Sequence, residues 1–100
     1  MDKITKEGLN KYFDITGRAI EKVKIVEHLE LSSESLRKFA HVFLDMAKRY
    51  YSDAKHFADK GDMVTAFAAL NYAHGWLDAG ARMGIFDVGG DSTLFTVDEK

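Results

Sequence analysis

The stretch FADKGDMVTAF, residues 57–67, decides the fold because it contains the end of one helix, a tight turn and the start of the next. Gly61 can adopt the left-handed conformation that often follows the last residue of a helix. Asp62 can then accept a hydrogen bond from a backbone N–H that has no partner in the first turn of a helix. A connection this short brings two helices together as antiparallel neighbours. The turn therefore predicts a helical hairpin over residues 33–60 and 62–83.

A third helix precedes this hairpin. Residues 33–60 carry apolar side chains at steps of four and three, which is the spacing of a coiled-coil-like seam. Its positions are Leu36, Ala40, Phe43, Ala47, Tyr50, Ala54 and Phe57. Residues 5–28 show helical spacing as well, after Thr5 as a suitable N-cap, and Ser32 or Ser33 can cap the helix that follows. The sequence thus predicts an all-α protein, a three-helix antiparallel bundle over residues 1–84.

Residues 85–100 follow a different period and are predicted to form a C-terminal tail outside the bundle. Two apolar runs, residues 85–88 and 94–97, flank the turn-forming residues GGDS, which is a hairpin-like signal. A lone two-stranded hairpin is marginally stable in water, so this one must either dock on the helices or stay mobile.

The composition excludes several classes of protein. The chain of 100 residues has 14 basic and 16 acidic side chains, and this balance gives no support to nucleic-acid binding. It contains no cysteine, so disulfides and thiolate metal sites are ruled out. The first residues lack the apolar core of a signal peptide, and no apolar run approaches membrane-spanning length. We therefore expect a cytoplasmic protein with no membrane partner.

The predicted third helix, residues 62–83, divides into two unlike sides on a helical wheel. The middle of its wide apolar arc holds the small residues Ala66, Ala69, Ala73 and Gly80, which would allow a neighbouring backbone to approach closely. The opposite sector carries a polar stripe, the helix-three stripe, formed by Asn71, His74, Gly75, Asp78 and Arg82. This stripe is the candidate surface for a partner or ligand.

Gly75 is the residue of the stripe that packing does not explain. A glycine inside a helix costs about 1 kcal/mol relative to alanine, and this one lies away from the small-residue arc. Either the C-terminal tail packs over it, or an external partner or ligand does, or the glycine is neutral.

Chemical motifs give no catalytic, metal-binding or cofactor-binding assignment. His41 and Asp45 lie one turn apart, as metal ligands can, but on the solvent side of the predicted helix 33–60. No Glu-x-x-His motif, nucleophile elbow or phosphate-binding glycine pattern occurs. Arg37 and His41 faintly resemble the Arg…His signature of the higher-eukaryote-and-prokaryote nucleotide-binding (HEPN) ribonucleases, although fewer residues separate them here. No cofactor is expected.

Residues 45–88 carry a family resemblance. They combine an aromatic-rich helix, the Gly-Asp turn at residues 61–62, the segment AFAALNYAHGWLDAG at residues 66–80 and a closing Ile-Phe at residues 85–86. In these features the chain resembles a small archaeal family catalogued as domain of unknown function 357, and its start is similar too, apart from Gly8. The resemblance implies a cytosolic archaeal protein with an all-helical fold. It supplies no established activity and no catalytic residue.

These observations favour a non-enzymatic module that forms a homo-oligomer or binds a protein partner. The alternative is a small ligand-binding domain or enzyme that uses Asn71, His74, Asp78 and Arg82. A second alternative is an HEPN-like, RNA-associated accessory domain, which the acidic net charge disfavours.

Overall fold

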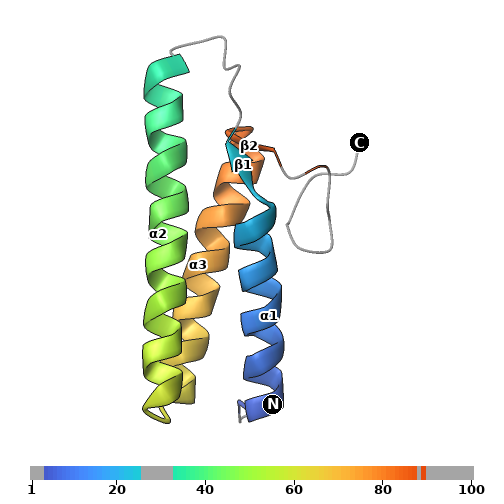
Figure 1. Ribbon diagram of the computed structural model, residues 1–100, viewed down its shortest axis with the longest axis vertical. Coiled ribbons are helices and arrows are strands. Elements are labelled where there is room, and N and C mark those ends of the chain that lie inside the picture. The colour runs from blue at the N-terminus through green and yellow to red at the C-terminus, as the bar shows by residue number, and fades with distance from the viewer. Residues whose placement is uncertain (1–3, 26–32, 88, 90–100) are drawn as a thin grey trace.

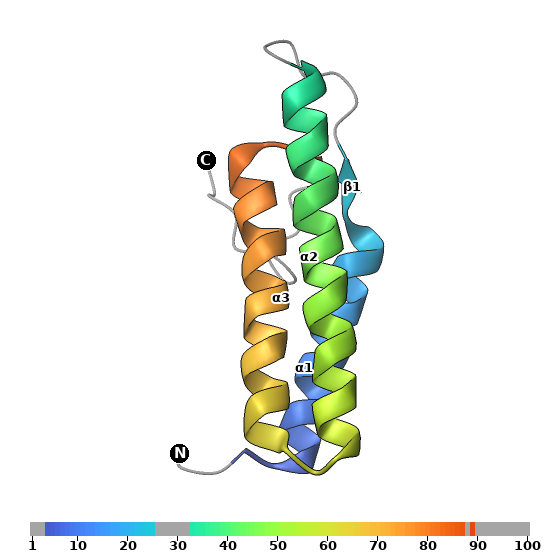
Figure 2. The same cartoon turned by 90° about the vertical axis from the view of Figure 1, so that its left-hand side faces the viewer.

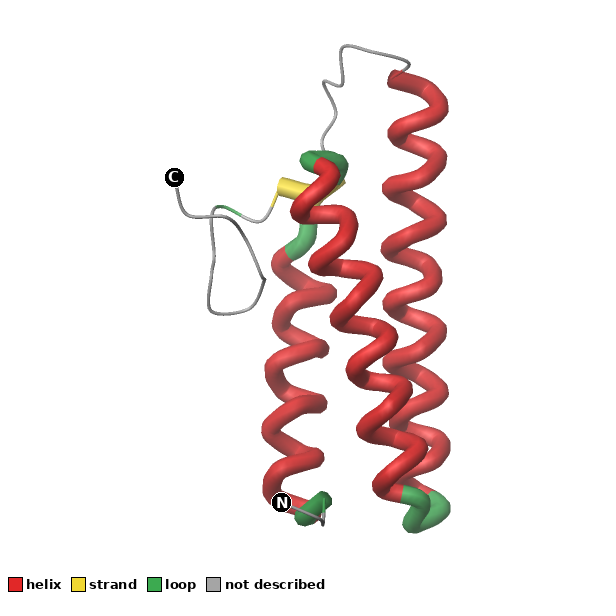
Figure 3. Tube along the Cα trace, turned by 180° about the vertical axis from the view of Figure 1, so that it is seen from behind, coloured by secondary structure: helices red, strands yellow, loops and turns green. Residues whose placement is uncertain are grey.

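The computed structural model of the chain (Figure 1) describes residues 4–25, 33–87 and 89. Three helices, α1 (Lys6–Lys22), α2 (Ser33–Asp59) and α3 (Met63–Met83), pack side by side, which confirms the predicted all-α fold. Figure 3 shows α3 between the other two helices, and α3 makes the extensive contacts with both, while α1 and α2 touch each other little. None of the helices in the described residues is both long and apolar enough to cross a membrane.

The turn between α2 and α3 forms as its sequence predicts. Gly61 has a φ of +84°, in the left-handed region, and the Asp62 side chain accepts a hydrogen bond of 3.1 Å from the Thr65 backbone N–H. At the other end of α3, Gly84 has a φ of +76° and ends the helix. The bounds of α2 and α3 agree with the predicted ones to within one residue.

The interface between α2 and α3 is built from small residues. Fully buried alanines recur along both helices: Ala40, Ala47 and Ala54 on α2, and Ala66 and Ala73 on α3. Larger side chains lie beside this seam in aromatic pairs. Phe43 contacts Trp76 edge-on at 5.0 Å between ring centroids, and Tyr50 stacks on Tyr72 at 5.3 Å. The alanine seam lets the two helices approach closely and leaves the aromatic rings at its margins.

The first helix is shorter than the sequence predicts. It ends at Lys22 instead of extending to about residue 28, and Lys24–Ile25 forms a short strand, β1. This strand pairs antiparallel with β2 (Phe86–Asp87), with Ile25 opposite Phe86. Ile25 is β-branched and suits a strand, and pairing with a segment distant in sequence overrides the local helical spacing. Residues 26–28 lie outside the described part of the chain.

The start of the tail is thus tied to the end of α1. The sequence pattern predicted residues 85–88 and 94–97 as the two strands of a hairpin, whereas Phe86–Asp87 pairs with Lys24–Ile25. Ile85 and Phe86 are buried in the core. Residues 94–97 lie outside the described residues.

Gly80 is the contact point for this small sheet on α3. A Cβ atom at Gly80 would collide with the ring of Phe86, which is almost completely buried. The space above the glycine is therefore filled by a side chain from β2. The small residue has the packing role that the sequence predicted, with an aromatic ring as the neighbour in place of a backbone.

Two glycines of α3 provide a matched test of this packing. Overpacking at Gly80→Ala costs about 1–3 kcal/mol, which outweighs the gain of about 1 kcal/mol in helix propensity, so we expect a lower free energy of unfolding. A Cβ atom at Gly75 meets no atom of the described residues within 4 Å, so Gly75→Ala should stabilise the protein by about 0.5–1 kcal/mol. Urea unfolding followed by circular dichroism measures both changes. Shifts of the same sign would contradict the packing described for Gly80.

The cap of α3 predicts a dependence on pH. Hydrogen bonds from the side chain and the backbone N–H of Thr65 hold the pKa of Asp62 below its ordinary value of 3.8. The ionised carboxylate therefore stabilises the fold above pH 3.8, and this contribution is lost as the pH falls through the lowered pKa. In Asp62→Asn this titration is absent, so the melting temperature should fall less steeply with acidification below that pH than in the wild-type protein. If the melting temperatures of both proteins fell equally steeply with pH, the charge of Asp62 would make no contribution to stability.

Candidate functional site

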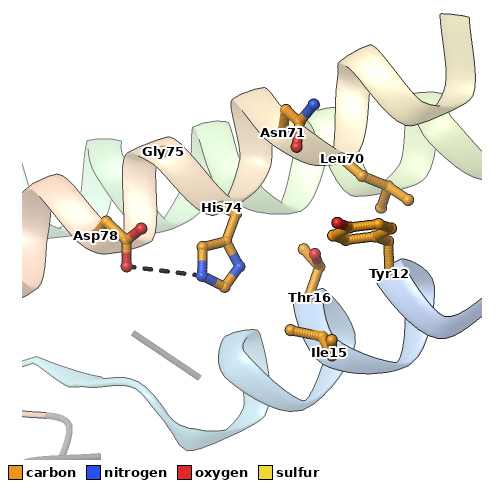
Figure 4. A pocket seen from close by; sticks show the side chains of 8 residues that line it. All are labelled: Tyr12, Ile15, Thr16, Leu70, Asn71, His74, Gly75 and Asp78. Atoms are coloured by element: carbon orange, nitrogen blue, oxygen red, sulfur yellow. Dashed lines mark ion pairs between the residues drawn. The ribbon is translucent and has the colours of Figure 1, made fainter. Parts of the chain in front are cut away.

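The structure brings four of the five residues of the helix-three stripe to one concave surface. A hollow of about 280 Å³ lies between α1 and α3, and we call it the α1–α3 hollow. It is lined by Tyr12, Ile15, Thr16, Leu70, Asn71, His74, Gly75 and Asp78 (Figure 4). Arg82 is exposed and is not among the lining residues.

His74 and Asp78 form the charged part of the hollow. The Nε2 atom of His74 lies 3.6 Å from Oδ1 of Asp78, and their side chains are only 24% and 22% exposed. This separation is longer than a hydrogen bond, so the contact is an ion pair when the imidazole is protonated. Although the stripe lies opposite the apolar arc of α3, more than three quarters of each of these two side chains is buried, and both line the hollow between α1 and α3.

The side of the hollow formed by α1 adds a second set of polar groups. Thr16 is buried, and the hydroxyl group of Tyr12 lies at the same edge (Figure 4). The Tyr12 ring is held edge-on against Phe67, with 4.7 Å between the centroids. Hydroxyl, amide, imidazole and carboxylate groups therefore surround a small space, and such groups recognise small polar molecules by hydrogen bonds.

The candidate metal-binding and catalytic residues of the sequence lie on separate helices. Within the described part of the chain, no three histidine or acidic side chains come together to hold a metal ion. Arg37, His41 and Asp45 are all exposed on α2, and Asp45 forms an ion pair of 2.8 Å with Arg49. The α1–α3 hollow combines one histidine–carboxylate pair with the hydroxyl groups of Thr16 and Tyr12.

Gly75 lies on the ridge between two hollows. Together with Asn71 it also lines a second hollow, of about 420 Å³, on the α2 side of α3. The other residues that line this second hollow are Phe43, Tyr50, Tyr72, Trp76 and Ala79. The sequence pattern does not decide whether the tail covers Gly75. Among the described residues nothing does, and residues 90–100 lie outside them.

The second hollow belongs to a larger apolar surface, which we call the α2–α3 face. Helical spacing extends this surface from the lining residues Phe43, Tyr50, Tyr72, Trp76 and Ala79 to Phe39, Val42 and Met46 of α2 and Met83 of α3. Four of these side chains, Phe39, Val42, Tyr72 and Met83, are between 46% and 62% exposed. None of the residues that line its hollow comes from α1, which lies behind α2 and α3 in Figure 2.

Sequence reasoning missed this face because it counted the large residues of α2 and α3 as core. Helical spacing shows that Tyr72, Trp76 and Met83 share one side of α3, but it does not show whether a neighbour covers them. The wide apolar arc of α3 fits its packing against both other helices and does not by itself reveal an exposed face.

Comparisons with known proteins agree with the resemblance of residues 45–88. Searches among curated proteins and among solved structures each return no significant match. The family described as "Protein of unknown function (DUF357)" matches residues 11–86, which is more than half of the chain and extends from within α1 to β2. On this match, the chain belongs to the DUF357 family.

Proposed function

We propose that the protein is a non-enzymatic interaction module and that the α2–α3 face is its binding surface. The observation that carries the proposal is the exposure of four large apolar side chains, Phe39, Val42, Tyr72 and Met83, on one side of the helical hairpin. The largest apolar patch on a soluble monomer is typically about 300–600 Å² and is often a functional surface.

The size of the exposed surface supports this reading. An aromatic side chain buries about 150–250 Å², so the four half-exposed side chains present on the order of 300–400 Å². At about 25 cal/mol per Å², covering them contributes roughly 8–10 kcal/mol, against a cost of association of about 4–15 kcal/mol. The four side chains thus offset much of that cost, and the remainder must come from the rest of the face.

The composition of the face is that of an interface core. Tyrosine, tryptophan, phenylalanine and methionine are enriched at such cores, and charged residues are depleted. No charged side chain lines the hollow between Phe43, Tyr72 and Trp76. The ion pair between Asp45 and Arg49 is exposed on α2 and is not among the lining residues.

Substitutions on the face should abolish partner capture without unfolding the protein. We expect Phe39→Ser with Tyr72→Ser to reduce cross-linked partner, recovered from cells that express the tagged chain, by at least about tenfold, because aromatic anchors dominate interfaces. Val64→Ser is the matched control, since Val64 is 69% exposed on α3 and lies outside the face. Quantitative mass spectrometry compares the three proteins. Equal recovery from the double variant and the control would contradict the proposal.

A small polar ligand in the α1–α3 hollow is a second candidate function. The observation in its favour is that Asn71, His74, Gly75 and Asp78 line a hollow together with Thr16 and Tyr12. Its volume of about 280 Å³ is close to the lower end for ligand pockets, about 300 Å³, so only a small molecule fits.

Nuclear magnetic resonance tests this second function directly. Mixtures of small polar carboxylic acids, amines and alcohols at about 1 mM should shift the amide signals of Thr16, Asn71 and His74, since weak ligands bind with millimolar affinity. His74→Ala should remove the shifts, whereas His56→Ala, at an exposed histidine of α2, should leave them unchanged. The absence of any shift at these residues, or its persistence in His74→Ala, would count against a ligand in the hollow.

A further inference from the structure

We infer that a second copy of this chain covers the α2–α3 face, with the two α2 helices antiparallel across a twofold axis. The inference rests on the proposed function, since it names the partner of the same face. Three properties of the face support it: the self-complementarity of its polar groups, the order of charges along its edge and its area.

The polar groups of the face and its hollow are compatible with the same surface on a second copy. A twofold interface places the same patch on both sides, so the polar groups of one copy meet the same patch of the other. The hydroxyl groups of Tyr50 and Tyr72, and the amide of Asn71 in the adjoining hollow, each donate and accept hydrogen bonds, so they can pair with any of the polar groups that they meet there. No carboxylate or ammonium group lines the hollow, so the closing of two faces buries no pair of like charges there.

The charges at the edge of the face favour an antiparallel pairing of α2. Lys38, Asp45, Arg49 and Asp53 are exposed and lie three, four, seven or eleven positions from Val42, so they share its side of the helix. Their signs run plus, minus, plus, minus along the chain. An antiparallel α2 of a second copy, with the axis between Met46 and Ala47, would place Asp45 one position from Arg49 and Lys38 two positions from Asp53, while the two copies of Asp45 lie three positions apart. A parallel arrangement in register would instead oppose like charges, which costs free energy.

The area of the face is at the lower end of the areas that each partner buries in stable dimers. The four half-exposed side chains, with the smaller exposed parts of Phe43, Met46, Tyr50 and Trp76, add up to roughly 600 Å² per copy. Two copies therefore bury about 1,200 Å², the lower bound of standard interfaces. We thus expect a dissociation constant on the order of 1–100 µM rather than an obligate dimer.

Cysteine cross-linking tests the pairing, because the chain has no cysteine of its own. Met46→Cys places a thiol next to the inferred axis, so oxidation at about 50 µM protein, within the expected range of the dissociation constant, should give a disulfide-linked dimer. Val64→Cys, exposed outside the face, is the control and should give at least about tenfold less. Addition of Val42→Asp to Met46→Cys should suppress the dimer by a similar factor, and circular dichroism verifies that this variant is folded. Equal yields at positions 46 and 64 would overturn the inference.

Light scattering after size-exclusion chromatography separates this inference from the proposed function. The mass of the wild-type protein should rise from 11.3 kDa towards twice that value as its concentration increases, and Phe39→Ser with Tyr72→Ser should stay at 11.3 kDa. A wild-type protein that stays at 11.3 kDa up to about 1 mM refutes the second copy, since the expected dissociation constant lies below that concentration. If the same double variant then still loses a cross-linked partner of different sequence, the proposed function stands. If the double variant recovers as much of every cross-linked partner as the wild-type protein does, both the second copy and the proposed function are refuted.

Discussion

The close approach of α2 and α3 through buried alanines is the constraint on which the rest of the structure depends. Because Ala40, Ala47 and Ala54 of α2 and Ala66 and Ala73 of α3 leave no room in the seam, the large side chains of both helices lie along its margins. One margin is covered by α1, where Phe13 contacts Tyr51 edge-on and Tyr12 contacts Phe67. At the other margin, the α2–α3 face is left partly exposed by the described residues. The proposed binding surface is therefore a consequence of how the core is built.

The parts of the fold that could be predicted from the sequence depend on local chemistry. Gly61 and Asp62 produce the turn from α2 to α3 by their own conformation and hydrogen bonding, and Gly84 ends α3 in the same way. The predicted end of α1, at about residue 28, was wrong. The strand Lys24–Ile25 replaces the last part of that helix because it pairs with Phe86–Asp87, some 60 positions away along the chain, and no local sequence pattern contains that pairing. Three-residue and four-residue spacing cannot show such a partner.

The sequence predicts which residues belong to the candidate site, but not how their neighbours surround them. Spacing placed Asn71, His74, Gly75 and Asp78 on one side of α3, and these four residues line the α1–α3 hollow. Spacing could not show that most of His74 and Asp78 is buried beside the α1–α3 hollow, nor that Tyr72 and Trp76 lie on the far side of Gly75 beside a second hollow. Both require knowing which neighbour packs on which flank of α3. The hollow and the α2–α3 face both lie within residues 11–86, the part of the chain that matches the DUF357 family.

The intrinsic fluorescence of Trp76 is the most direct test of the claim that the α2–α3 face is a covered surface in the working protein. Trp76 is the only tryptophan of the chain and lies within the face, next to Phe43. If two copies cover the face, the rate of quenching by acrylamide should fall severalfold as the protein concentration rises from about 1 µM to about 1 mM, across the expected dissociation constant. A rate that is the same at every concentration, and equal to that of Val42→Asp, would contradict the account.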